Sequence, residues 1–108
     1  MYQYKASIKR VIDGDTAVLD VDLGFHIWLH DLHFRFYGIN APEKTDHEGW
    51  AAATDYVENF FKEFPQVIVT VHGEDKYGRW LADFVDPTGC GTLNMQLVNL
   101  GLAKVYFP

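Results

Sequence analysis

The alternation of apolar and polar positions predicts strands in the first part of the chain. Residues 4–12 are typical of a strand, which ends at Asp13-Gly14, a dipeptide that favours a tight turn. Residues 19–23 then alternate between aliphatic and acidic side chains, as a half-buried strand does. We therefore expect two successive strands before the chain turns back at Leu23-Gly24.

The return strand changes the face on which its apolar residues lie. These residues occupy odd positions from 25 to 29 and even positions from 32 to 36. A strand has a period of two, so its apolar set changes face only through a bulge or a break. We expect that irregularity near Asp31, and bulges of this kind help small barrels bend.

An amphipathic helix is predicted next. Residues 45–48 match a capping-box pattern, and large apolar residues then recur at helical spacing as far as Pro65. We expect this stripe to face the core, as in most surface helices. It comprises Trp50, Ala53, Val57, Phe60, Phe61 and Phe64.

The remaining pattern predicts two strands, at 67–71 and 80–86, and then a short helix. That helix carries Leu93, Leu97 and Leu100 and ends at Gly101, before a brief segment over 102–107. Three strands, a helix, two strands and a helix make a mainly β fold with α (α+β). An OB-like five-stranded barrel with one longer and one short helix is favoured, and an open α+β sandwich is the alternative.

Composition narrows the class of protein. With 48% hydrophobic and 22% charged residues, the 108 residues fit a single globular domain, which we place at 1–108. Cys90 is the one cysteine, and the polar start carries no signal-peptide pattern, so we expect a cytoplasmic protein without a membrane span. The net charge of −6 argues against tight non-specific DNA binding, but a nuclease needs acids for a cation site.

Three short segments carry the candidate chemistry. The run from Arg35 to Glu43 brings an arginine, which suits phosphate oxygens, into a turn with a carboxylate. Asp13-Gly14-Asp15 puts two carboxylates around a glycine at a strand junction. The segment 75–79, Asp-Lys-Tyr-Gly-Arg, combines two cations with an aromatic ring. Taken singly, each is also compatible with an ordinary polar turn.

All three segments in this order resemble the staphylococcal-nuclease-like (thermonuclease) family. The segment from Leu93 to Val105 resembles the closing helix and strand of that family, so the resemblance covers roughly residues 4–107. It implies an OB-like barrel and a calcium-dependent endonuclease that cuts DNA or RNA and leaves a 3′-phosphate. Its substrate would be nucleic acid, and its cofactor would be Ca²⁺.

The resemblance also implies a metal site. Asp15 matches the first calcium-binding aspartate of the family, and Ala41 matches a residue whose backbone carbonyl contacts the ion. Asn40 stands where a second aspartate is expected. An amide oxygen still ligates calcium, but the missing charge predicts weaker binding.

Catalytic and substrate-binding roles follow from the same resemblance. Glu43 matches the carboxylate that positions or deprotonates the attacking water, and Arg35 and Arg79 match the arginines that bind the phosphate. Lys76 and Tyr77 match positions that contact a terminal phosphate of a bound nucleotide. Because Asn40 departs from the family pattern, a non-catalytic or attenuated module that binds nucleic acid or protein is the alternative.

Two further departures concern the C-terminus and the first hairpin. Tyr106 and Phe107 only approximately match the two tyrosines that the family places near a bound nucleotide. The hairpin around residues 25–33 is longer than the shortest in the family and contains His26, His30 and His33. Residues four apart in a strand lie ~13 Å apart, too far to share a zinc ion, so we expect a barrel arm or a surface for another chain.

Overall fold

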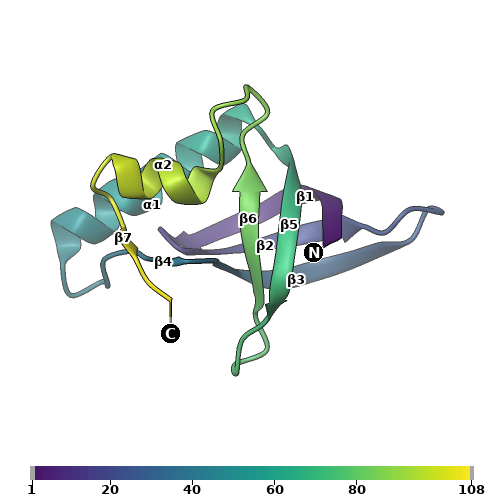
Figure 1. Ribbon diagram of the computed structural model, residues 1–108, viewed down its shortest axis with the longest axis horizontal. Coiled ribbons are helices and arrows are strands. Elements are labelled where there is room, and N and C mark those ends of the chain that lie inside the picture. The colour runs from purple at the N-terminus through teal and green to yellow at the C-terminus, as the bar shows by residue number, and fades with distance from the viewer. Residues whose placement is uncertain (1, 108) are drawn as a thin grey trace.

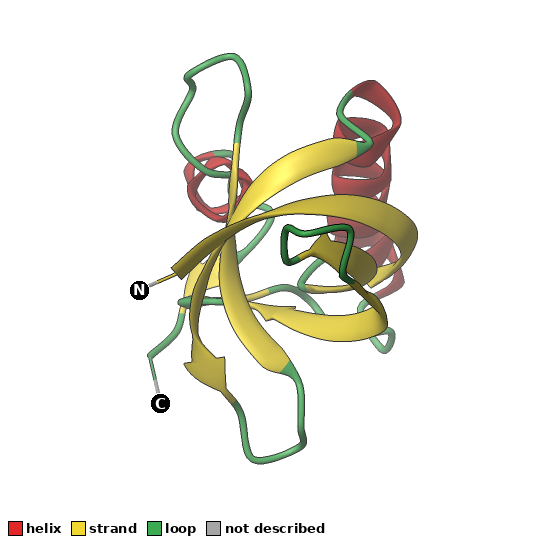
Figure 2. Cartoon of the chain, turned by 90° about the vertical axis from the view of Figure 1, so that its right-hand side faces the viewer, coloured by secondary structure: helices red, strands yellow, loops and turns green. Residues whose placement is uncertain are grey.

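Five strands close into a barrel in the computed structural model, which describes residues 2–107 (Figures 1 and 2). The barrel strands are β1 (Tyr2–Asp13), β2 (Thr16–Asp22), β3 (Trp28–Phe36), β5 (Gln66–Glu74) and β6 (Trp80–Val85). Their order is β1-β2-β3-β6-β5; β3 and β6 pair in parallel, and every other pair is antiparallel. The predicted α+β fold with an OB-like barrel is confirmed.

The barrel interior is built on aromatic rings. The ring of Phe84 lies 4.5 Å from that of Phe36 and 6.0 Å from that of Phe34, measured between centroids. Helix α1 (His47–Glu63) adds Phe61 in an edge-to-face contact with Phe84 at 5.7 Å. Edge-to-face pairs add stabilisation beyond the apolar area they bury. The predicted aromatic stripe of the helix therefore faces the core.

The predicted change of face in the third strand is a β-bulge at Asp31. This residue has a φ of 59°, and the register between β2 and β3 shifts opposite it. Its backbone amide donates a hydrogen bond to Asp20 Oδ1 at 2.9 Å, which holds the extra residue in place. The tip of the hairpin differs from the prediction, because β3 begins at Trp28 and Phe25 lies in the turn rather than in a strand.

The helix termini were predicted less accurately than the helices. Asp46, not Thr45, caps α1, and its side chain accepts a hydrogen bond from the amide of Gly49 at 3.2 Å. The second helix, α2 (Leu93–Asn99), ends before Gly101 as expected. Leu100 was predicted to lie within this helix, but it is the C-terminal cap residue and is exposed.

Two further short strands are present; the first was not predicted, and the second falls in the segment that resembles the closing strand of the family. β4 (Ile39–Asn40) and β7 (Lys104–Val105) form a separate antiparallel pair in which Asn40 lies opposite Lys104. This pair brings the C-terminal segment beside the turn that follows β3 (Figure 1). Among residues 2–107, no helix has the length and apolar content needed to cross a membrane.

Candidate active site

The turn between β1 and β2 is held by its own acids. The amide of Asp15 donates to Asp13 Oδ1 at 3.2 Å, and the hydroxyl of Thr16 donates to Asp15 Oδ1 at 3.1 Å. The other oxygen of Asp15, Oδ2, accepts a hydrogen bond from the amide of Ala41 at 2.9 Å. The turn is thus tied to the segment that follows β4.

Gly14 allows this close approach. A Cβ atom at this position would lie 2.6 Å from the Cβ of Ala53 on α1 and 2.9 Å from the Cβ of Ala41. Such distances are too short for any side chain, so Gly14 is required for α1 to pack against the turn. The glycine that the sequence suggested for a tight turn therefore also sets how near the helix lies to Asp15.

The carboxyl group of Asp15 lies in a largely desolvated position, with 14% of its side chain exposed. Burial raises its pKa to about 6, and hydrogen bonding with Asp13 acts in the same direction. The charge of Arg35 opposes the rise without cancelling it. An additional positive charge near this carboxylate would therefore favour its ionised form.

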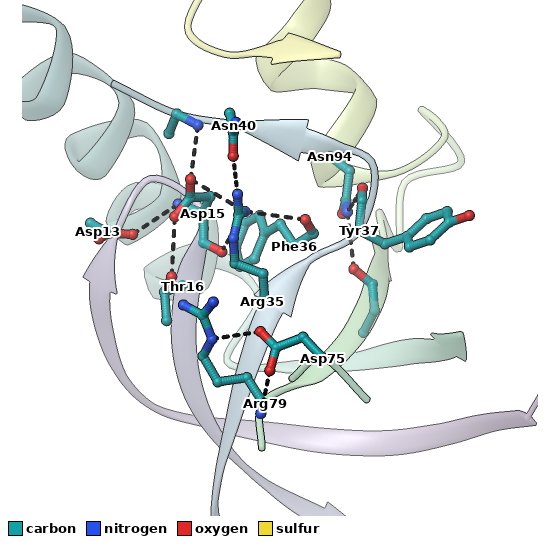
Figure 3. A network of polar contacts seen from close by, with 12 residues as sticks. Asp13, Asp15, Thr16, Arg35, Phe36, Tyr37, Asn40, Asp75, Arg79 and Asn94 are labelled. Carbon is teal, nitrogen blue, oxygen red and sulfur yellow. Dashed lines mark hydrogen bonds and ion pairs between the residues drawn. The ribbon is translucent and has the colours of Figure 1, made fainter. Parts of the chain in front are cut away.

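Arg35 connects the turn to β4. It leaves β3 near its end, and its Nη1 lies 3.2 Å from Asp15 Oδ2 and donates to the carbonyl of Phe36 at 3.3 Å. Its Nη2 donates to Asn40 Oδ1 (Figure 3). The structure thus brings together four residues that were predicted to share a site: Asp15, Arg35, Asn40 and Ala41.

Glu43 makes no hydrogen bond or ion pair with this cluster through its side chain. It occupies an exposed turn before α1, where its backbone carbonyl accepts a hydrogen bond from the amide of Asp46 at 2.9 Å. Its carboxylate takes part in no hydrogen bond or ion pair with any residue from 2 to 107. The role predicted for Glu43 therefore stays a prediction.

Arg79 is oriented by Asp75 in the connection between β5 and β6. Asp75 Oδ1 accepts the amides of Tyr77 and Arg79, each at 2.9 Å, and Oδ2 accepts Arg79 Nε at 2.8 Å. Partial burial alone would raise the pKa of Asp75, but these hydrogen bonds outweigh it, and the pKa is lowered. One carboxylate therefore shapes the loop and leaves the outer guanidinium nitrogens of Arg79 available (Figure 3).

The ring of Tyr77 lies near two cations of this loop. Lys76 Nζ is 5.3 Å from its centroid, and the guanidinium carbon of Arg79 is 5.5 Å away on the same ring. Both distances are within the range of cation–π attraction. Since Tyr77 is 71% exposed, the ring remains free to contact a ligand.

An open pocket of about 810 Å³ joins the loop to the end of β3. Five of the predicted site residues line it: Arg35, Asn40, Lys76, Tyr77 and Arg79. Tyr106 and Phe107 line it as well, so the C-terminal rings lie where the resemblance expected them. Asp15, Ala41 and Glu43 are not among the lining residues. Glu74 and Asp75 also line the pocket, which thus combines three cations with two acids and several rings, whereas Asp15 contacts Arg35 from outside the lining.

A comparison with known protein families shows which family this chain belongs to. The model of the staphylococcal nuclease homologue family matches residues 33–108. This chain belongs to that family. The matched range includes Arg35, the β4 segment, the 75–79 loop and the C-terminal rings, which confirms the resemblance seen in the motifs.

Two curated relatives share the staphylococcal nuclease homologue region. Endonuclease YhcR of Bacillus subtilis (strain 168) is 30% identical over 117 residues, which cover 97% of this chain and 9% of that protein. The thermonuclease of Staphylococcus intermedius is 29% identical over 111 residues, covering 93% of this chain and 58% of its own length. The chain therefore spans a small part of the first relative and somewhat over half of the second.

The sequence did not predict a group of contacting side chains next to the pocket. The ring of Tyr37 stacks on His72 at 3.8 Å and meets Phe107 edge-on at 5.4 Å, and His72 Nε2 lies 2.6 Å from Asp83 Oδ2. Gly38, with φ of 77°, leaves room for Phe107, since a Cβ there would lie 2.9 Å from its ring. These residues meet because β5, which carries His72, pairs with β6, which carries Asp83; no local pattern in the sequence links residues 37, 72 and 83.

Asn94 is a second residue without a sequence signal. It is buried at the start of α2, where its amide nitrogen donates to the carbonyls of Tyr37 and Ala82, each at 3.0 Å. Its Oδ1 accepts the amide of Phe84 at 3.2 Å. Buried polar groups are costly unless they are paired, so Asn94 fastens α2 to β6 and to the turn after β3.

Proposed function

We propose that this chain is a calcium-dependent endonuclease that hydrolyses phosphodiester bonds in DNA or RNA. The observation that carries the proposal is that Arg35 and Arg79, which lie on different parts of the barrel, line one open pocket. Each guanidinium is held by a carboxylate, Asp15 for Arg35 and Asp75 for Arg79. Two oriented guanidinium groups at one pocket suit a bound phosphate better than an uncharged ligand.

In this proposal Arg35 and Arg79 stabilise the transition state. Phosphoryl transfer spreads negative charge over the equatorial oxygens, so catalysis depends on positioned positive charge rather than on a covalent intermediate. Arginine forks form charge-assisted hydrogen bonds that strengthen as this charge develops. The bond from Asp75 to Arg79 Nε fixes the orientation of one fork before substrate binds.

Glu43 supplies the carboxylate that positions or deprotonates the attacking water. Its place in the turn after β4, one residue beyond Pro42, puts it on the same segment as Asn40 and Ala41. Its side chain is exposed, so a water molecule reaches it freely. The proton of the water would pass to Glu43 as the new P–O bond forms and the leaving oxygen departs.

The donor set at the turn fits a hard cation. Asp15 Oδ2 and Asn40 Oδ1 both point at the guanidinium of Arg35, so two oxygens already converge on one positive group. Residues 2–107 contain no cluster of three or more His, Cys, Asp or Glu side chains able to hold a metal, so the other ligands would be the carbonyl of Ala41 and water. A bound calcium ion would polarise the phosphate and orient the water. With one carboxylate among its ligands, we expect this site to bind calcium weakly.

Lys76 and Tyr77 bind the substrate beside the reacting phosphate. Their loop places an ammonium group and an exposed ring at the pocket entrance, which suits a neighbouring phosphate and a base or sugar. Tyr106 and Phe107 line the same pocket and add rings on which a base can stack. No hydroxyl role is assigned to Phe107.

The proposal is tested by cleavage of a labelled oligonucleotide by purified protein across a calcium titration. We expect cleavage that rises with calcium and that falls by orders of magnitude in the Arg35→Ala, Arg79→Ala double variant. Lys62→Ala, on the helix away from the pocket, serves as the matched control for removal of a positive charge. Equal cleavage by wild type and the double variant would refute the proposed endonuclease activity of this site.

A non-catalytic or attenuated module that binds nucleic acid is the second candidate. It is favoured by the engagement of Arg35 with Asp15 and Asn40, and by the position of Glu43 outside the set of residues that line the pocket. Binding of the oligonucleotide without turnover at every calcium concentration would support this candidate over the first. Turnover distinguishes the two candidates, since both require Arg79 for binding.

A further inference from the structure

His72 lies beside the pocket, and the proposed function gives it no role. Its imidazole stacks on the ring of Tyr37, with 3.8 Å between the centroids and 6° between the planes. Its Nε2 lies 2.6 Å from Asp83 Oδ2, and only 15% of its side chain is exposed. Because an ionised carboxylate can only accept a hydrogen bond, Nε2 carries the hydrogen. The imidazole is therefore held both at one nitrogen and by a stack.

A β-bulge sets the position of His72. The register between β5 and β6 shifts between Val71 and Gly73, so His72 is the extra residue of β5. Gly73 has a φ of 139°, a backbone conformation that favours glycine. Bulges are frequent beside active sites, where they redirect a side chain. The bulge is thus a first indication that the direction of His72 serves the pocket.

Tyr37 is fixed at its backbone as well as at its ring. Its amide donates to the carbonyl of Ala82 at 2.9 Å. Its carbonyl accepts a hydrogen bond from Asn94 Nδ2 at 3.0 Å (Figure 3). With the backbone held, the direction of the ring depends on its side-chain torsions, which the stack on His72 restricts. Since Tyr37 lines the pocket, the stack fixes part of the pocket wall.

The C-terminal segment packs against Tyr37. The ring of Phe107 meets that of Tyr37 edge-on at 5.4 Å. Gly38 leaves room for Phe107, and its carbonyl accepts the amide of Tyr106 at 2.8 Å. Phe107 lines the pocket and is 63% exposed. Most of its ring is therefore open to a ligand, while Tyr37 determines where that ring lies.

We propose that His72 is a positioning residue for the aromatic wall of the pocket, which consists of Tyr37 and Phe107. Asp83 orients the imidazole, the imidazole holds Tyr37, and Tyr37 holds Phe107, against which a base of the substrate packs. This role rests on the proposed function, because it requires a nucleotide in the pocket. His72 itself contacts no substrate.

The geometry gives His72 no direct part in the reaction. It is not among the residues that line the pocket, and its Nε2 is bound to Asp83. A general base must lie within hydrogen-bonding reach of the water that it deprotonates. Arg35 and Arg79 bind the phosphate in the proposed function, whereas rings contact a base through its π-face. Loss of His72 should therefore weaken the contact with the base and leave the phosphate contacts unchanged.

Kinetics with two substrates test this role. One is an oligonucleotide, and the other has the same length but carries tetrahydrofuran in place of its bases. His72→Ser should raise KM for the first substrate about three- to tenfold, the range expected for one lost aromatic contact. KM for the abasic substrate should stay at the wild-type value. The kcat values should not change, because Arg35, Glu43 and Arg79 are intact.

Two variants of Asp83 test the orientation of the imidazole. Asp83→Asn keeps an oxygen that accepts from His72 Nε2, so it should behave as wild type does. Asp83→Leu has no acceptor and should raise KM for the oligonucleotide as His72→Ser does. His30→Ser is the matched control, because it removes a histidine that also lies beside an aspartate, Asp20 at 3.3 Å, outside the pocket lining. It should change neither KM nor kcat.

Hydrogen exchange of the free protein gives a measurement that does not depend on nuclease activity. In His72→Ser the amide of Tyr106, which donates to Gly38, should exchange about tenfold faster or more, because the C-terminal segment opens locally. The amide of Phe36, which donates to the carbonyl of Asp15, should keep its wild-type rate. Equal acceleration at both amides would mean that His72 has a general structural role, and would overturn the proposal.

The outcomes separate this role from the endonuclease itself. If wild type cleaves and KM is unchanged in His72→Ser, or rises equally for both substrates, the role of His72 is overturned and the endonuclease stands. If wild type binds the oligonucleotide without cleaving it, the endonuclease is refuted. Dissociation constants for the two oligonucleotides, measured by fluorescence anisotropy, then decide the role of His72 by the same comparison.

Discussion

The orientation of Arg79 by Asp75 gives a sharp prediction about catalysis. Asparagine at position 75 retains one oxygen, which still accepts the amides of Tyr77 and Arg79. It replaces the other oxygen, at 2.8 Å from Arg79 Nε, by an amide nitrogen that cannot accept a hydrogen bond. Asp75→Asn therefore preserves the loop and removes only the contact that aims the guanidinium.

The size of the effect follows from that contact. A hydrogen bond between charged groups contributes about 1.5–3 kcal/mol. Solvent reaches 32% of the Arg79 side chain, so we reduce this to about 1–2 kcal/mol. At about 1.4 kcal/mol per factor of ten, kcat/KM for an oligonucleotide should fall about five- to thirtyfold in Asp75→Asn.

A double-mutant cycle separates orientation from other causes. We expect Asp75→Asn to lower kcat/KM in the wild-type background and to have no further effect in Arg79→Ala. Urea unfolding of each variant shows whether the fold is retained. An equal loss of kcat/KM in both backgrounds, or an unchanged kcat/KM in Asp75→Asn, would refute the reasoning.

Three further predictions concern the metal, acid stability and the fold. Asn40→Asp should raise the calcium affinity measured by calorimetry. The gain in binding free energy has a ceiling of about 4 kcal/mol, for one added charge at ~4 Å and an effective dielectric of ~20. An unchanged affinity would mean that position 40 is not a ligand. Folding lowers the pKa of Asp75 below its ordinary value of 3.8, so the ionised carboxylate stabilises the fold at pH values above 3.8. The free energy of unfolding of wild type relative to Asp75→Asn should therefore decline as the pH falls below 3.8. A difference that stays constant across pH would contradict this. Asn94→Ala leaves the amide of Phe84 and the carbonyl of Tyr37 without this partner, whereas the carbonyl of Ala82 still accepts from the amide of Tyr37. Urea unfolding should therefore show a loss of about 2 kcal/mol or more, and a loss under about 1 kcal/mol would contradict the buried network.

Local patterns in the sequence predicted the barrel because each pattern is compatible with few structures. The change of apolar face near Asp31 allowed only a bulge or a break, and the bulge is present. The aromatic stripe between residues 50 and 64 could be buried only as a helix against the strands. The cap at Asp46 instead of Thr45 was missed because both side chains can cap a helix, and local sequence does not decide between them.

The candidate site was predictable in its residue types but not in its connections. Arg35, Asn40, Lys76, Tyr77 and Arg79 were expected together and line one pocket. The contact of Arg35 with Asp15, which lies in another turn, depends on how the barrel closes, which no local pattern specifies. The stacking of Tyr37 on His72 depends in the same way on strands brought together by the fold. Long-range pairing, rather than composition, therefore limits what the sequence reveals about the site.

The central claim is that one phosphate group binds between Arg35 and Arg79. The most direct measurement is nuclear magnetic resonance of the arginine Nε–H groups during titration with a short oligonucleotide under calcium-free conditions, where turnover is not expected. We predict that both Arg35 and Arg79 signals shift together, and that neither shifts with a methylphosphonate oligonucleotide, which lacks the phosphate charge. Shifts of other arginine signals alone, or equal shifts with the uncharged oligonucleotide, would contradict the account.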